Sequence, residues 1–170
     1  TRAVKNIDHV IHAAALKHVT STEYNPDESL KTNVFGTMNL IDSCIAEKVK
    51  KILLISTDKA VSPVNLYGAT KLCAEKLFMS ANSISGKDSK FSILRYGNVY
   101  SSRGSLFEIL NSKDNINITD PNMTRFHISK KDAIKNSFFV LNNMRGSEIF
   151  IPKLRSYKLS YITEIFKKKN

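Results

Sequence analysis

The 170-residue sequence contains little of what defines several common classes of protein. It has two cysteines, no Cys-x-x-Cys spacing and no Cys/His cluster with the spacing of metal ligands, so we expect no metal site. Cys44 and Cys73 are predicted to be small buried apolar side chains without a redox role. No apolar run approaches the roughly 18 residues of a membrane span, and no signal-peptide pattern opens the chain. We therefore expect a cytoplasmic protein without a membrane span.

Acidic residues are also scarce, because 15 Asp and Glu stand against 26 Lys and Arg, which gives a net charge of +11. Such a charge would suit nucleic acid or an anionic membrane surface. The lysines are scattered, however, apart from residues 167–169, and aromatic residues do not alternate with basic ones as they do on a base-stacking surface. We interpret the charge as a solvated basic surface and expect no nucleic-acid partner. Part of this positive charge would bind a nucleotide diphosphate and a phosphorylated cofactor.

A short apolar run at residues 52–55 is the clearest structural signal in the chain. Four consecutive aliphatic residues predict a strand that is buried on both faces of a parallel sheet. The polar residues 56–59 (STDK) follow immediately, so they are placed at the carboxyl end of that strand. Open α/β sheets bind their ligands at this edge.

Tyr67 and Lys71 are four residues apart at the start of a helical pattern, so their side chains share one face of the helix. An ammonium beside a phenol favours the phenolate, so we expect Lys71 to lower the pKa of Tyr67 and make it a base near neutral pH. Tyr67 and Lys71, together with the Thr57 hydroxyl, the Asp58 carboxylate and the Lys59 amine at the strand end, form a predicted site for proton and hydride transfer. Its catalytic residues would be Thr57, Asp58, Lys59, Tyr67 and Lys71.

Strands and helices alternate over the first part of the chain. Strands are predicted at residues 7–13, 51–56 and 91–95, with a helix starting at Asn25-Pro26 and interrupted by Gly36, and another at residues 68–81 that buries Cys73, Leu77 and Ala81. Beyond residue 97 we expect helices at residues 105–112, 132–142 and 157–169 and a strand at residues 148–151. The pattern predicts an α/β fold with a doubly wound parallel sheet.

Several short blocks, in order, resemble the extended short-chain dehydrogenase/reductase superfamily, and within it the CapD-like polysaccharide-biosynthesis group of configuration-inverting UDP-N-acetylglucosamine 4,6-dehydratases. They are residues 12–19 (HAAALKHV), 32–37 (TNVFGT), 56–61 (STDKAV), 65–71 (NLYGATK), 95–99 (RYGNV), 102–105 (SRGS), 118–126 (ITDPNMTRF) and 146–153 (GSEIFIPK). The resemblance extends from about residue 8 to residue 153. A lone Tyr-x-x-x-Lys is a weak signal, but its position after Ser-Thr-Asp-Lys is specific.

The glycine-rich loop that holds the cofactor pyrophosphate in this superfamily is absent, and the chain has only six glycines. The resemblance therefore implies a Rossmann fold that lacks its first βα units, on the order of 60–90 residues, and only part of a small α/β substrate domain. Residues 1–97 would be the C-terminal part of the NADP-binding domain, and residues 98–170 the remainder. We expect a fragment that binds NADP poorly, from a parent that forms homo-oligomers.

The resemblance also implies binding residues. Those for the cofactor would be Ala13, Ala14, Ala15, Asn33, Ser56, Tyr67, Lys71, Asn98 and Val99, with Asn33 fixing the backbone near the catalytic lysine. Those for the substrate would be Lys17, His18, Thr57, Asn98, Arg103 and Arg125. Three departures from the family pattern concern the sugar pocket: Ser101 replaces a glycine, His127 replaces a tryptophan, and residues 106–117 form a shorter segment.

The implied reaction is the NADP-dependent removal of water from a UDP-hexosamine, with NAD as the alternative cofactor. Tyr67 would take the proton of the 4-hydroxyl, and Asp58 and Lys59 would serve elimination in an order that the sequence leaves open. Two alternatives remain: a sugar-nucleotide epimerase of the same fold, and a non-catalytic remnant or binding module.

Overall fold

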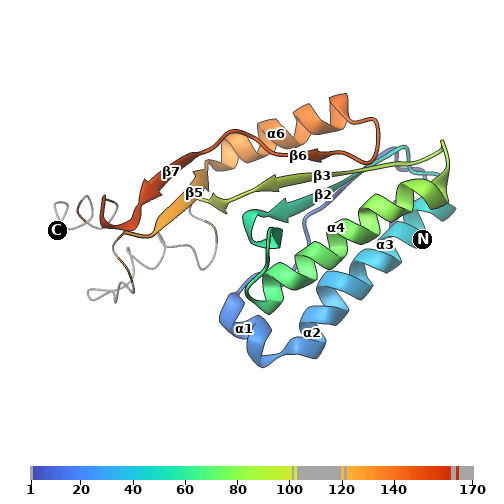
Figure 1. The fold of residues 1–170 in the computed structure, drawn as a ribbon. Coiled ribbons are helices and arrows are strands. Elements are labelled where there is room, and N and C mark those ends of the chain that lie inside the picture. The colour runs from blue at the N-terminus through green and yellow to red at the C-terminus, as the bar shows by residue number, and fades with distance from the viewer. Residues whose placement is uncertain (1, 101, 103–119, 121, 162–163, 165–170) are drawn as a thin grey trace.

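The computed structural model describes residues 2–100, 102, 120, 122–161 and 164 (Figure 1). Its centre is a four-stranded parallel sheet in the order β1-β2-β3-β6. The strands are β1 (His9–His12), β2 (Lys51–Thr57), β3 (Lys90–Tyr96) and β6 (Ile149–Phe150). Every pairing within this sheet is parallel, which confirms the predicted α/β class.

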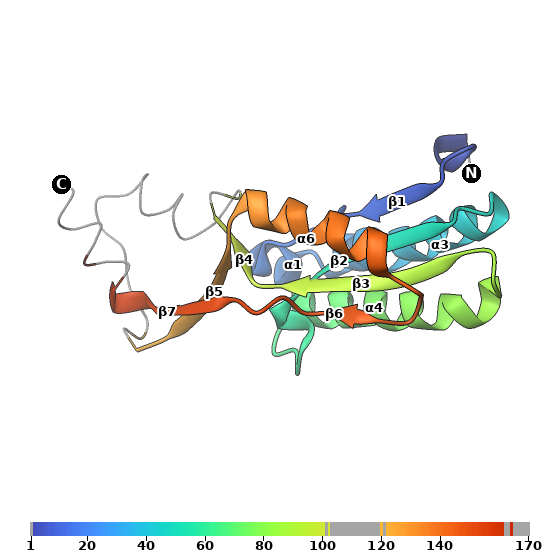
Figure 2. The ribbon, with the colours of Figure 1, turned by 90° about the horizontal axis from the view of Figure 1, so that it is seen from above.

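Helices cover both faces of this sheet (Figures 1 and 2). On one face lie α1 (Val19–Tyr24), α2 (Pro26–Leu30), α3 (Gly36–Ala46) and α4 (Leu66–Ser85), and on the other lies α6 (Lys130–Asn143). Ile52 and Leu54 of β2 join the core under α3 and α4, whereas Leu53 joins the core under α6. Burial on both faces explains the continuous apolar run, because each successive side chain of a strand points to the opposite face.

Residues 26–46 form one continuous helical segment rather than an interrupted helix. A π-helical turn, η2 (Lys31–Phe35), joins α2 to α3, and Gly36 has ordinary helical geometry with a φ of −59°. The prediction that Gly36 interrupts the helix was therefore wrong. The widened turn contains the buried residue Asn33, which is 2% exposed.

The buried face of α4 differs in part from the predicted one. Ala81 is buried as predicted, whereas Cys73 is exposed and Leu77 is only half-buried. Ala74 and Phe78 are buried in their place, and the buried face also contains Lys71 and Glu75. Apolar spacing alone does not indicate that a face with two charged residues is the buried one. Cys44 is buried as predicted.

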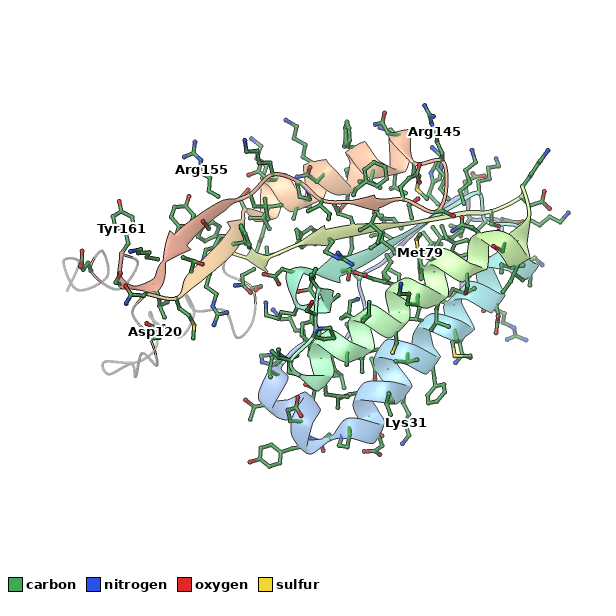
Figure 3. All side chains as sticks on the ribbon, viewed as in Figure 1. Lys31, Met79, Asp120, Arg145, Arg155 and Tyr161 are labelled. Atoms are coloured by element: carbon green, nitrogen blue, oxygen red, sulfur yellow. The ribbon has the colours of Figure 1, made fainter. Side chains whose placement is uncertain are left out.

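A second sheet lies beyond the carboxyl ends of the first and has the order β4-β5-β7. It consists of β4 (Asn98–Val99), β5 (Thr124–Ile128) and β7 (Arg155–Lys158). Figure 3 shows Tyr161 beside this sheet and Arg145 at the opposite end of the molecule.

The predicted helix at residues 157–169 was wrong at its start, since Tyr157 pairs with Arg125 in an antiparallel ladder.

The remaining elements after residue 97 lie close to their predicted positions. α6 corresponds to the helix expected at residues 132–142, and β6 to the strand expected at residues 148–151. The helix expected at residues 105–112 falls outside the described residues. Both α6 and β6 return to the first sheet, and the division into domains 1–97 and 98–170 stays a prediction.

Candidate active site

A cavity of about 630 Å³ lies at the carboxyl ends of β2 and β3. It is bounded by the segment after β1, the end of β2, the first turns of α4 and the junction of β3 with β4. Its lining contains these residues predicted from the sequence: Ala13, Ala15, Lys17, His18, Ser56, Thr57, Lys59, Tyr67, Lys71, Asn98 and Val99. Segments far apart in the chain therefore meet at the edge of the sheet where a ligand was expected.

The end of β2 carries a compact polar cluster. A short 3-10 turn, η3 (Asp58–Ala60), follows the strand, and Thr57 Oγ1 accepts a hydrogen bond from the Lys59 backbone N–H at 3.3 Å. Thr57 Oγ1 also donates to Asp58 Oδ1 at 3.0 Å. Lys59 Nζ lies 3.0 Å from the same oxygen and 3.3 Å from Asn98 Oδ1 on β4. The predicted acid and amine thus form an ion pair beside the threonine, and each side chain is about one-third exposed.

Tyr67 enters the cavity from the first turn of α4, which begins after Asn65. The Asn65 side chain caps the helix by accepting from the Gly68 N–H at 2.8 Å. Burial raises the pKa of the Tyr67 phenol, and the Asp58 carboxylate adds to this, while a hydrogen bond with Thr57 acts in the opposite direction. The phenol is therefore a proton donor in this arrangement unless further positive charge approaches it.

Lys71 lies at the base of the cavity and is 4% exposed. Its Nζ donates to the Ile55 carbonyl at 2.8 Å, and burial lowers the pKa of its ammonium to about 8, against the opposing charge of Glu75. The expectation that Lys71 lowers the pKa of Tyr67 was wrong for this structure, because burial of the phenol dominates. The two residues do line the same cavity, as their spacing indicated.

Asn33 supports the cavity wall without lining it. Its Oδ1 accepts from the Leu16 N–H at 2.8 Å, and its Nδ2 donates to the Leu16 carbonyl at 2.9 Å and to Thr70 Oγ1 at 3.0 Å. Leu16 precedes Lys17 and Thr70 precedes Lys71, so one buried amide connects the two sides of the cavity. Asn33 thus fixes the backbone at Leu16 and the side chain of Thr70 beside Lys71, and its expected roles at the catalytic lysine and the cofactor stay predictions.

The segment after β1 forms the opposite wall of the cavity. Ala13 and Ala15 line it but Ala14 does not, and Lys17 Nζ donates to Ser102 Oγ at 3.1 Å across its edge. His18 also lines the cavity and precedes the first residue of α1.

The two arginines of the predicted substrate site are not placed in the cavity. Arg103 lies outside the described residues. Arg125 is exposed on β5, where its Nη2 lies 3.4 Å from Met123 Sδ. Its role in binding a phosphate or base therefore stays a prediction. His127, two residues further along β5, is buried and stacks on the Tyr100 ring with centroids 5.1 Å apart.

Several cavity residues were not predicted from the sequence: Val19, Thr20, Ser21, Ile55, Tyr96, Gly97 and Ser102. Tyr96 could have been found, because it directly follows the strand predicted at residues 91–95, next to the strand that carries Thr57. The residues of α1 carry no such signal, since they reach the cavity only through the path of the chain after β1.

Among the residues that the structure describes, no helix is both long enough and apolar enough to cross a membrane. Within the same residues, no three His, Cys, Asp or Glu side chains gather into a group that could hold a metal ion.

Comparison with known proteins gives consistent matches over nearly the whole chain. The family described as "Polysaccharide biosynthesis protein" matches residues 1–169. The chain is 52% identical over 167 residues to the UDP-N-acetylglucosamine 4,6-dehydratase (inverting) of Campylobacter jejuni subsp. jejuni serotype O:23/36 (strain 81-176), covering 93% of this chain and 49% of that protein. It is 36% identical over 177 residues to the UDP-glucose 4-epimerase of Rickettsia akari (strain Hartford), covering 99% and 52%.

A solved structure, that of Pen from Bacillus thuringiensis, matches with a TM-score of 0.94 and 41% identity, covering 99% of this chain and 53% of that one. The chain thus spans about half the length of the relatives it matches.

Proposed function

The chain belongs to the polysaccharide biosynthesis protein family, and on that basis we propose that it carries the catalytic residues of a sugar-nucleotide 4,6-dehydratase. The proposed substrate is UDP-N-acetylglucosamine and the proposed cofactor is NADP, with NAD as the alternative. The observation that carries the proposal is the Asp58–Lys59 ion pair, which lies beside Thr57 near Tyr67 and Lys71. Such a pair offers both an acid and a base for elimination.

The residues of the cavity fit a nicotinamide cofactor. The small side chains of Ala13 and Ala15 allow a ring to approach the wall closely, and the Lys71 ammonium can hydrogen-bond a ribose hydroxyl. A bound nicotinamide would supply reversible hydride acceptance. Tyr67 would act as a base where positive charge approaches its phenol and opposes the effect of burial on its pKa.

The first step requires removal of the proton from the 4-hydroxyl of the sugar. Tyr67 would accept this proton as the hydride leaves carbon 4, and Thr57 would hydrogen-bond the same hydroxyl. Lys71 would hold the ribose hydroxyls of the cofactor.

The second step is loss of water across carbons 5 and 6. The new 4-ketone acidifies the hydrogen at carbon 5, and one member of the Asp58–Lys59 pair removes it. The other protonates the 6-hydroxyl, which leaves as water. Return of hydride to carbon 6 and of a proton to carbon 5 gives the 4-keto-6-deoxy sugar. The pair can exchange a proton internally, because Lys59 Nζ and Asp58 Oδ1 are 3.0 Å apart.

A second candidate function is 4-epimerisation, which the match to a UDP-glucose 4-epimerase favours. Epimerisation needs Tyr67, Thr57 and Lys71 for hydride transfer but needs no elimination pair. The two functions therefore differ in what they require of Lys59.

The test uses the full product of the reading frame that contains this chain, incubated with UDP-N-acetylglucosamine and NADP. We expect mass spectrometry to detect a product that has lost one water. Lys59→Ala should abolish water loss but retain hydride exchange at carbon 4, whereas Tyr67→Phe should lower both by roughly 10²–10⁴-fold. Lys76→Ala, at an exposed position on α4, is the matched control and should keep full activity.

Two results would count against the dehydratase. Interconversion of 4-epimers without any dehydrated product would assign the epimerase function instead. Full dehydration by Lys59→Ala would remove the role proposed for the ion pair.

A further inference from the structure

Glu75 is a buried carboxylate that the proposed mechanism does not use. It is 2% exposed and lies on α4 one helical turn after Lys71, which itself follows Tyr67 by one turn. The three residues share a face of the helix, so the Tyr-x-x-x-Lys pattern continues here as Tyr-x-x-x-Lys-x-x-x-Glu. A buried carboxylate is costly unless it is paired and hydrogen-bonded.

The partners of Glu75 come from the ends of both central strands. Ser56 Oγ donates to Glu75 Oε1 at 2.5 Å, and Arg95 Nε donates to the same oxygen at 3.1 Å. Arg95 Nη2 donates to Oε2, which completes a two-pronged ion pair. Ser56 and Arg95 lie opposite each other in the β2–β3 ladder. One carboxylate therefore joins α4 to both strands.

Each partner adjoins residues of the cavity. Ser56 lies between Ile55, whose carbonyl accepts from Lys71, and Thr57, which hydrogen-bonds Tyr67. Arg95 precedes Tyr96, which lines the cavity and lies opposite Thr57 in the ladder. A shift of the Glu75 carboxylate would therefore move the end of β2, which carries the Thr57 hydroxyl and the Ile55 carbonyl that accepts from Lys71.

Glu75 also supplies the negative charge that faces Lys71 from the same helix. Glu75 and His12 interact electrostatically with Lys71, and Arg95 is paired with Glu75. Tyr67 of α4, Lys59 of η3 and Tyr96 of β3 line the same cavity as Lys71. Burial of Lys71 disfavours its ammonium form, and Glu75 acts against that effect.

We propose that Glu75 is a positioning residue of this site, which together with Arg95 and Ser56 holds the ends of β2 and β3 against α4. The same carboxylate is the negative charge that opposes the effect of burial on Lys71. Its catalytic consequence rests on the proposed function, because only then does Lys71 hold a cofactor ribose. Its electrostatic consequence concerns Lys71 alone and is testable without any activity.

The first measurement is an NMR titration of the chain labelled with ¹³C-lysine, in which the Lys71 resonance is assigned by its loss in Lys71→Arg. In the wild type the pKa of Lys71 should be about 8. Glu75→Gln removes the charge and keeps the shape, so the pKa of Lys71 should fall by about one unit or more. Glu28→Gln, at an exposed position on α2, is the matched control and should leave it unchanged.

Loss of Glu75 alone leaves Arg95 buried beside an uncharged amide, which destabilises the fold. The double variant Glu75→Leu with Arg95→Met removes both charges and replaces them with apolar side chains of similar size, an exchange that folded proteins commonly tolerate. It should fold, and the pKa of Lys71 should again fall below that of the wild type, by less than in Glu75→Gln, because loss of the more distant Arg95 charge offsets part of the loss of the carboxylate on the same helix face. An unchanged pKa of Lys71 in the folded double variant would overturn the proposal.

The kinetic measurement uses the full product of the reading frame. For the double variant we expect kcat to fall at least tenfold with little change in KM for the sugar nucleotide, and the alkaline limb of the kcat profile to move to lower pH. A merely structural ion pair would leave the position of that limb unchanged. If the wild type shows no dehydratase activity, the proposed function fails, and the titration of Lys71 still decides the proposal about Glu75.

Discussion

Replacing Asn33 with alanine should destabilise the fold more than its position on a helical segment suggests. The side chain is 2% exposed and makes three hydrogen bonds, two to the backbone of Leu16 and one to Thr70. Thr70 keeps a second bond, from its hydroxyl to the Tyr67 carbonyl at 2.9 Å, so its loss is small. The two Leu16 bonds join residues 17 positions apart and have no replacement within the helix.

The magnitude follows from these bonds. The two Leu16 bonds are worth about 1 kcal/mol each and the Thr70 bond about 0.5 kcal/mol, and the buried groups that lose a partner add a further penalty of about 1 kcal/mol. Alanine recovers about 0.5 kcal/mol because it favours a helix more than asparagine does. The net loss in the free energy of unfolding should therefore be about 3 kcal/mol, which is a large part of the total for a domain of this size.

The assay is urea unfolding of Asn33→Ala, with Asn39→Ala as the control. Asn39 is exposed on α3, and no side-chain hydrogen bond is seen for it among the described residues, so its replacement should change stability by less than about 0.5 kcal/mol. Hydrogen exchange should show faster exchange of the Leu16 amide in Asn33→Ala alone. A loss below about 1 kcal/mol, or an unchanged Leu16 amide, would refute the reasoning.

Three further predictions concern pH, packing and thiol reactivity. Burial lowers the pKa of His12 from its ordinary 6.5 to about 4, so the free energy of unfolding of the wild type should fall as the pH is lowered from 6.5 to 4. His12→Gln lacks this dependence, so its free energy of unfolding in urea should rise by about 2–3 kcal/mol relative to the wild type over that range. Parallel pH curves for the two proteins would contradict this. A Cβ on Gly68 would lie 2.2 Å from the Lys59 carbonyl oxygen of η3, so Gly68→Ala should unfold at a clearly lower temperature than the wild type. A Cβ on Gly36 would meet only ordinary contacts, so Gly36→Ala should increase the free energy of unfolding by up to about 1 kcal/mol. A thiol reagent should modify exposed Cys73 rapidly and Cys44 slowly, since burial raises the pKa of the latter to about 11; equal rates would be inconsistent with the structure.

The elements of the parallel sheet could be predicted because their signals are local. The aliphatic run of β2 and the Asn-Pro start of α2 each lie within a few residues, and burial on both faces of β2 follows from the absence of polar alternation. The position of residues 56–59 at the carboxyl end of β2 followed from the same local pattern. Short motifs in a fixed order then indicated the family, which the match over residues 1–169 confirms.

The buried face of α4 could not be predicted in this way. Lys71 and Glu75 are charged, and whether a charge is buried depends on partners elsewhere in the chain. Glu75 is satisfied by Arg95, which lies 20 positions away, and Lys71 by a carbonyl of β2. Tyr157 illustrates the same limit in a strand, because its place in β7 depends on pairing with β5.

The sequence by itself therefore determined the fold class, the family and the residues placed at the end of β2 and the start of α4, since periodicity and short motifs depend on neighbours along the chain. Only the tertiary structure decided which side chains share the cavity, that Asn33 connects its walls, and that burial raises rather than lowers the pKa of Tyr67. The physical reason is that desolvation and long-range hydrogen bonds depend on the packing of distant segments. A four-residue spacing can place Tyr67 and Lys71 on one face of a helix, but the environment that surrounds them sets the balance between the charged and neutral forms.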